Sequence, residues 1–99
     1  MRRGTTPTIT CTLSTDIDLA DCELIRVIIR QGGHVKLIKE AGDVTILDKT
    51  ISVKLSQEET FAFYQGTADI QVRIKASDAV YATGIKSIRV DTSLDEEVL

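Results

Sequence analysis

The sequence predicts an all-β domain, and two observations lead to this prediction. Ile, Val and Thr together supply 32 of the 99 residues, whereas the chain contains four aromatic residues and no Trp. A branched Cβ packs well on a pleated surface and loses side-chain freedom in a helix. The apolar residues also alternate with polar ones at a period of two, which places them on one side of a strand. A chain of this length forms one small domain.

Seven runs of strand length follow one another, separated by turn-forming residues. Gly32 and Gly33 lie between two of these runs and are typical of a tight hairpin, because both glycines can adopt positive φ. Gly84, in the middle of the last run, predicts a bulge or a bend. The expected strands are 8–13, 23–31, 35–40, 44–47, 51–55, 67–75 and 79–91.

The period of two breaks at Ser56-Gln57-Glu58-Glu59. This is the pattern of a capping box, in which each of the two end residues accepts a hydrogen bond from the backbone of the other. It predicts one short helical turn near residues 56–60. No helix-length segment separates the strands, which excludes parallel βαβ units and leaves a sandwich or a small barrel. Seven short antiparallel strands in about 100 residues favour an immunoglobulin-like β-sandwich.

The alternation also predicts the core and the limits of the domain. We expect residues 1–7 to form an N-terminal leader, residues 8–91 the immunoglobulin-like sandwich, and residues 92–99 an acidic C-terminal tail. The side chains expected inside are Ile9, Cys11, Ile25, Val27, Ile29, Val35, Leu37, Ile51, Val53, Leu55, Ile70, Val72, Ile74, Ile88 and Val90.

The charge is spread unevenly. The net charge is −3, but four carboxylates lie within residues 91–99, so the rest of the chain is close to neutral. Phosphate binding needs a basic patch, which argues against nucleic acid as a partner. No apolar run approaches the roughly 18 residues that a membrane span needs, and no apolar segment follows Arg2 and Arg3 as in a signal peptide. We therefore expect synthesis in the cytoplasm and no membrane partner.

The residues that could carry chemistry form no recognised motif. Cys11 and Cys22 could pair or bind a metal, but their spacing fits no zinc site, and we expect free thiols. His34 follows a turn and is expected in solvent. The acidic residues of segment 16–21 lack the pattern of a calcium loop, so a solvated loop is favoured over a weak ion site. The sequence thus predicts no enzyme activity, no cofactor and no metal.

Apolar residues on the outward side of the strands are the better indication of function. If Ile25, Val27 and Ile29 point inward, their neighbours point outward. One interpretation is a set of scattered exposed hydrophobic residues, which is ordinary; the other is an apolar stripe with a basic rim, buried against a partner. The second interpretation predicts a protein interface at Leu24, Arg26, Ile28, Arg30, Ile38, Tyr81 and Ile85. The same interpretation pairs the acidic tail with a basic surface of a neighbour, for example Arg2 and Arg3 of another copy.

Four segments together carry a resemblance to a known group of proteins: 3–8 (RGTTPT), 51–61 (ISVKLSQEETF), 68–75 (ADIQVRIK) and 94–99 (LDEEVL). They resemble short structural proteins encoded in prophages of gut Firmicutes, and these are similar to the N-terminal immunoglobulin-like domain of phage baseplate upper proteins. The resemblance implies a non-enzymatic tail or baseplate module, located in the virion, that acts by assembly with other virion proteins or with itself. It implies no catalytic residues.

Two other functions stay open at the level of sequence. One is a carbohydrate- or cell-surface-binding module, although sugar sites usually stack the sugar on aromatic rings and this chain has few. The other is a small cytoplasmic regulator that binds a host protein.

Overall fold

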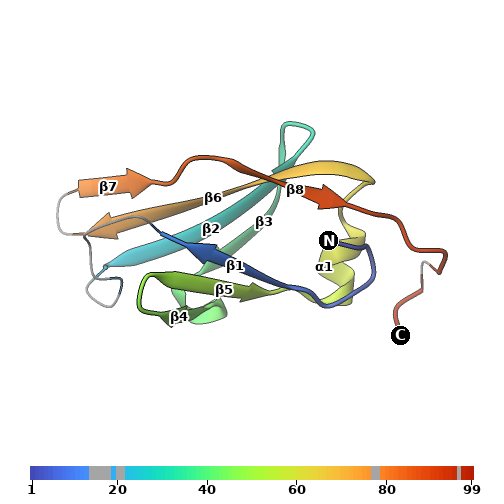
Figure 1. Ribbon diagram of the computed structural model, residues 1–99, viewed down its shortest axis with the longest axis horizontal. Helices are drawn as coiled ribbons and strands as arrows, with labels where there is room; N and C mark the ends of the chain where they lie inside the picture. The colour runs from blue at the N-terminus through green and yellow to red at the C-terminus, as the bar shows by residue number, and fades with distance from the viewer. Residues whose placement is uncertain (14–18, 20–21, 77–78, 96) are drawn as a thin grey trace.

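The computed structural model describes residues 1–13, 19, 22–76, 79–95 and 97–99, and it contains two antiparallel sheets packed as a sandwich (Figure 1). The molecule is elongated, with extents of 46 × 25 × 17 Å. The all-β prediction is therefore confirmed. The acidic segment 16–21 and the turn expected at 77–78 lie outside the described residues, except for Leu19, which is buried in the core.

The strand order is that of an immunoglobulin-like domain. The smaller sheet has the order β1 (Thr8–Thr12), β5 (Thr50–Lys54), β4 (Thr45–Leu47). The larger sheet has the order β3 (His34–Glu40), β2 (Leu24–Gln31), β6 (Gly66–Ala76), β7 (Ala79–Ala82), and β8 (Lys86–Val90) also pairs with β6. These orders correspond to strands B-E-D and C′-C-F-G of the immunoglobulin fold. The described residues contain eight strands instead of about seven, because the last run is divided into β7 and β8.

The expected helical turn is helix α1 (Gln57–Phe61), at one end of the sandwich (Figure 1). Both bonds of the capping box are present. The N–H of Glu59 donates to Oγ of Ser56 at 3.2 Å, and the N–H of Ser56 donates to Oε1 of Glu59 at 2.9 Å. A second short helix, the 3₁₀ turn η2 (Ala41–Asp43), connects β3 to β4. The prediction of one helical turn near 56–60 is confirmed.

The core lies between the two sheets, as the alternation predicts. Ile9, Cys11, Leu37 and Ile88 are only partly buried, and they lie on β1, β3 and β8, each of which pairs with a single neighbouring strand. The prediction was wrong for Val35, which is 56% exposed. The expected core residues that are buried are Ile25, Val27, Ile29, Ile51, Val53, Leu55, Ile70, Val72, Ile74 and Val90.

Val35 is exposed because β3 contains a bulge. The β2–β3 hairpin itself is as expected, with Gly32 and Gly33 at φ values of 61° and 80°. After the turn, Val35 pairs with Arg30, but the next pair is Leu37 with Ile29, so Lys36 is an extra residue in β3. Cross-strand partners point to the same side of a sheet. Val35 therefore shares the outward direction of Arg30 instead of the inward direction of Leu37.

A second bulge separates β7 from β8. The register of β7 pairs Arg73 with Ala82, and the register of β8 pairs Ile70 with Lys86. The chain between Ala82 and Lys86 therefore contains one residue more than the part of β6 opposite it. The extra residue falls near Gly84, where the sequence predicted a bulge or bend. Because one added residue reverses the side to which all later side chains point, the inward and outward positions exchange along this run.

Residues 1–5 are tied to the rest of the chain rather than projecting from it. Arg2 forms a parallel bridge with Asp91, and the N–H of Arg3 donates to the Asp91 carbonyl at 2.9 Å. The hydroxyl of Thr60, on α1, accepts from the N–H of Gly4 at 2.9 Å and donates to the carbonyl of Thr5 at 3.0 Å. The N-terminal segment thus closes the α1 end of the sandwich.

Candidate functional site

The side of the larger sheet that faces away from the smaller sheet is the candidate site, and we call it the outer face. Its members alternate along each strand with the buried core residues, and cross-strand pairing brings them into rows. The outer face consists of Leu24, Arg26, Ile28 and Arg30 of β2, their partners Lys75, Arg73, Gln71 and Asp69 of β6, Val35, Ile38 and Glu40 of β3, Val80 and Ala82 of β7, and Ile85.

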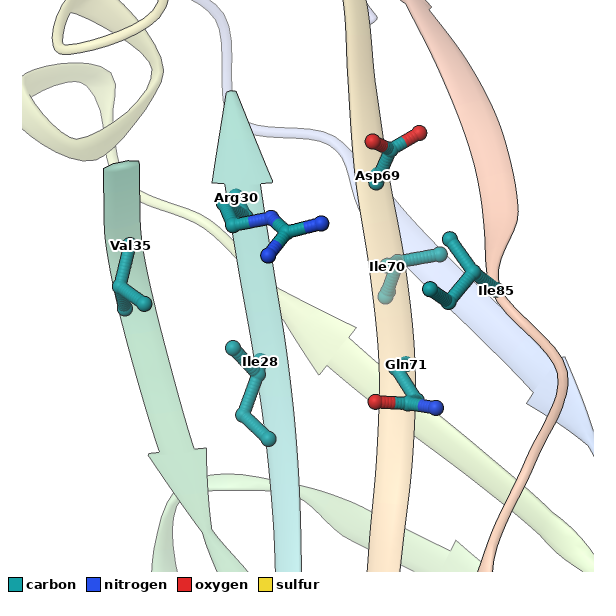
Figure 2. Close-up of a pocket in the computed structure, with 7 residues that line it drawn as sticks. All are labelled: Ile28, Arg30, Val35, Asp69, Ile70, Gln71 and Ile85. Atoms are coloured by element: carbon teal, nitrogen blue, oxygen red, sulfur yellow. The ribbon is translucent and has the colours of Figure 1, made fainter. Parts of the chain in front are cut away.

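The two bulges direct apolar side chains into one hollow of the outer face. Without the bulge in β3, Val35 would point into the sandwich opposite Gln31; without the bulge near Gly84, Ile85 would point inward beside Ile70. With the bulges, Val35 and Ile85 line a shallow hollow together with Ile28 and Arg30 (Figure 2). Bulges commonly occur at sheet edges and redirect side chains near functional sites.

Thr83 fixes the segment that carries Ile85. The N–H of Thr83 donates to the carbonyl of Val72 at 2.9 Å, and the N–H of Val72 donates to the Thr83 hydroxyl at 3.0 Å. The Gln71 side chain donates to the Thr83 carbonyl at 2.8 Å. These three bonds hold the chain against β6 at the point where regular pairing stops, and Ile85 follows two residues later.

A second hollow lies further along the outer face. Leu24 and Val80, which are 53% and 55% exposed, line it together with Arg26, Arg73 and Lys75. Leu24 lines this second hollow and Ile28 lines the first, so the two hollows lie four residues apart along β2. The face therefore offers two depressions, and the Arg26–Arg73 row forms the edge of the second one that faces the first.

The charges of the outer face are mainly basic. Arg26 lies 3.5 Å from the Glu40 carboxylate, and Lys75 lies 3.8 Å from that of Glu23. Both pairs are exposed and contribute little to stability. Arg30 and Arg73, one in each hollow, make no ion pair within the described part of the chain. Two guanidinium groups are thus available to a partner.

The structure brings together six of the residues expected at the interface: Leu24, Arg26, Ile28, Arg30, Ile38 and Ile85 lie on the outer face. Tyr81 does not join them. It pairs with the buried Ile74, so its ring points to the other side of β7, where it is 49% exposed. The sequence reasoning missed Val35 and Val80. The bulge expected at Gly84 is the signal that indicates Val80 in place of Tyr81.

The other residues considered from sequence form no site. His34 is exposed at the start of β3. Burial raises the pKa of the Cys11 thiol, and the charge of Lys86 only partly offsets this; the thiol is therefore less reactive than an ordinary cysteine. Among the described residues, no three His, Cys, Asp or Glu side chains gather as metal ligands. Within the same residues, no helix has the length and apolar character that crossing a membrane requires.

Comparisons with protein-family models and with curated proteins find no match for this chain.

Proposed function

We propose that this protein is a non-enzymatic assembly module of a phage or prophage structural apparatus, located in the virion, and that it binds a partner protein through the outer face. The observation that carries the proposal is the hollow at Ile28, into which two separate bulges direct Val35 and Ile85. An antiparallel sheet that faces water on one side normally carries polar residues there. Two irregularities that both add apolar surface favour a face that is covered in use.

The composition of the outer face agrees with a protein partner. Protein interfaces combine an apolar centre with a polar rim, and Arg is enriched in them. Here the apolar side chains of Ile28, Val35 and Ile85 share the outer face with Arg26, Arg30 and Arg73. The phage assignment rests on the resemblance of segments 3–8, 51–61, 68–75 and 94–99 to prophage structural proteins.

The carbohydrate-binding function receives no specific support. A sugar site usually presents an aromatic ring as a platform, and the outer face contains no aromatic residue within the described part of the chain. Tyr81 points to the opposite side of β7, and Tyr64 lies in the connection between α1 and β6, where the Lys36 ammonium lies 4.6 Å from the centre of its ring.

The proposal is tested first by the neighbouring genes and then by binding. We expect genes for portal, tail-tape or baseplate proteins beside the gene for this chain. Each neighbouring product is then co-expressed with it, and complexes are detected by size-exclusion chromatography with light scattering. We expect a complex that is lost in the double variant Val80→Glu/Ile85→Glu, because both residues are exposed on the outer face.

The matched control is Leu47→Asp, which changes an exposed apolar residue of the smaller sheet. We expect this variant to keep the complex. A complex that survives the outer-face variant as well as the control would contradict the proposed use of the outer face.

A further inference from the structure

Residues 94–99 have the chemical properties that the outer face requires of a partner. Their sequence is Leu-Asp-Glu-Glu-Val-Leu, so three consecutive carboxylates lie between apolar residues. The side chains of Leu94, Val98 and Leu99 are 108%, 51% and 92% exposed. The chain's own fold therefore covers little of this apolar surface, and the segment is available to another molecule.

The segment is held away from its own outer face. The Gln57 side chain binds the backbone of Leu99 with two hydrogen bonds, of 2.7 and 3.0 Å. Figure 1 shows the end of the segment beyond α1, at the opposite end of the molecule from β7, which carries Val80. Contact between this segment and both hollows thus requires two molecules.

We propose that residues 94–99 of one copy bind to the outer face of a second copy. This inference rests on the proposed function, because it takes the outer face as the assembly surface. Leu94 and Val98 are four residues apart, which in an extended chain is about 13 Å and places both side chains on one side. Leu24 and Ile28 on β2, one in each hollow, have the same spacing. Leu94 and Val98 thus each match one hollow.

The charges agree with this placement. In the extended chain the middle one of the three carboxylates points to the side of Leu94 and Val98 and lies between them, as the Arg26–Arg73 row lies between Leu24 and Ile28 along β2. Arg73 makes no ion pair within the described residues, and the same holds for Arg30. A guanidinium can bind a carboxylate with two parallel hydrogen bonds, which adds specificity.

The N-terminal arginines are less suited to receive the acidic segment. Nη1 of Arg2 donates to the carbonyl of Thr92 at 2.6 Å, and Nη2 of Arg3 donates to the carbonyl of Phe61 at 3.1 Å. Arg3 also lies over the ring of Phe61 at 5.6 Å. Both side chains therefore bind within their own chain, and the outer face supplies the basic surface for the neighbour.

The contact joins two different surfaces, so it is heterologous. Each copy contributes one outer face and one segment, and successive copies form an open chain, or a ring if the rotation between copies closes. A face-to-face dimer, by contrast, would consume both outer faces and stop at two copies. Mixing two complementary variants distinguishes these assemblies.

The face variant is Val80→Glu/Ile85→Glu, and the segment variant is Leu94→Asp/Val98→Asp. All four residues are at least half exposed, so both variants should fold, and thermal melts verify this. Sedimentation velocity is measured over a wide concentration range. We expect the wild type to gain mass with concentration, each variant alone to associate at least about tenfold more weakly, and an equimolar mixture to form a species of two copies. Leu47→Asp should associate as the wild type does.

The mixture is decisive because the intact segment of the face variant can bind the intact face of the segment variant. A wild type that is monomeric at all concentrations would overturn the inference, and so would a mixture that forms no two-copy species. If the face variant fails to fold, Arg30→Glu/Arg73→Glu replaces it. The proposed function fails by a separate result, namely a neighbouring-gene product that binds the face variant as well as the wild type.

Discussion

The ammonium group of Lys39 lies 2.7 Å from Oε2 of Glu59, so one carboxylate joins β3 to the start of α1. Oε1 of the same side chain accepts the Ser56 N–H in the capping box. Partial burial raises the pKa of Glu59, but the Lys39 bond and charge and the Ser56 bonds outweigh this, and the pKa lies below its ordinary value. The pair links the helix cap to the sheet that carries the outer face.

This ion pair should make stability depend on pH. The pKa of Glu59 is lower in the folded than in the unfolded chain, so its contribution is present above the ordinary glutamate pKa. This stabilising contribution is lost as the pH falls from the ordinary glutamate pKa to the lowered pKa of the folded chain. Glu59→Gln should lower the free energy of unfolding by about 0.5–1 kcal/mol at neutral pH, and its difference from the wild type should shrink with acid. Urea unfolding from neutral to acidic pH measures this.

The capping bond of Glu59 can be separated from its ion pair by comparing Glu59→Gln with Glu59→Ala. Gln can still accept the Ser56 N–H, as in other capping boxes, whereas Ala cannot. Glu59→Ala should therefore cost more than Glu59→Gln at every pH, and Ser56→Ala should cost about 1 kcal/mol through loss of the other bond. Equal unfolding curves for Ser56→Ala and the wild type would contradict the role of Ser56 as cap.

Thr60 should be the residue that holds the N-terminal segment, residues 1–5, against α1. Its side chain is fully buried, and its hydroxyl bonds to Gly4 and Thr5. Thr60→Val keeps the shape but leaves these backbone groups without their partner, at a cost of about 1–3 kcal/mol. Hydrogen exchange should then increase at residues 2–5 before the sheets are affected. Unchanged exchange at these amides would show that the segment is held by other contacts.

Gly4 should be intolerant of substitution for a separate reason. It has a φ of 77°, and a Cβ there would fall 2.5 Å from Cζ of Phe61. Gly4→Ala should cost at least about 1 kcal/mol, because left-handed backbone is unfavourable for a residue with a Cβ, and the ring must also move. A thermal melt of Gly4→Ala, with Gly42→Ala as a control at an open glycine position of ordinary φ, measures the difference.

Val35 and Leu37 show where the sequence pattern stops being informative. The period-two pattern indicates the strands, the hairpin at Gly32-Gly33 and most of the buried apolar residues, because burial on one face is what creates that pattern. A single bulge at Lys36 reverses the phase of Val35, and alternation contains no record of an inserted residue. Long-range hydrogen bonds are equally hidden. Buried Gln31 binds the backbone of Tyr64 at 2.7 and 2.8 Å, which no local pattern predicts.

Substitutions at Val35 and Leu37 test the position of the bulge in β3. Val35→Glu should leave stability within about 0.5 kcal/mol, because the side chain is exposed. Leu37→Glu should destabilise the domain by more, because Leu37 packs against the core. Thermal melts of the two variants provide the comparison, and the reverse order of stability would place the bulge elsewhere. Val72→Asp, in the centre of β6, should prevent folding altogether.

Hydroxyl-radical footprinting of the assembled and the dissociated protein tests most directly whether the outer face is the assembly surface. The assembled sample is either the self-associated chain or its complex with a partner. The account predicts that oxidation of Leu24, Ile38, Val80 and Ile85 falls on assembly, while Leu47 and Tyr64, which are exposed elsewhere, react as before. Unchanged oxidation of the outer-face residues, together with protection of Leu47 or Tyr64, would contradict it.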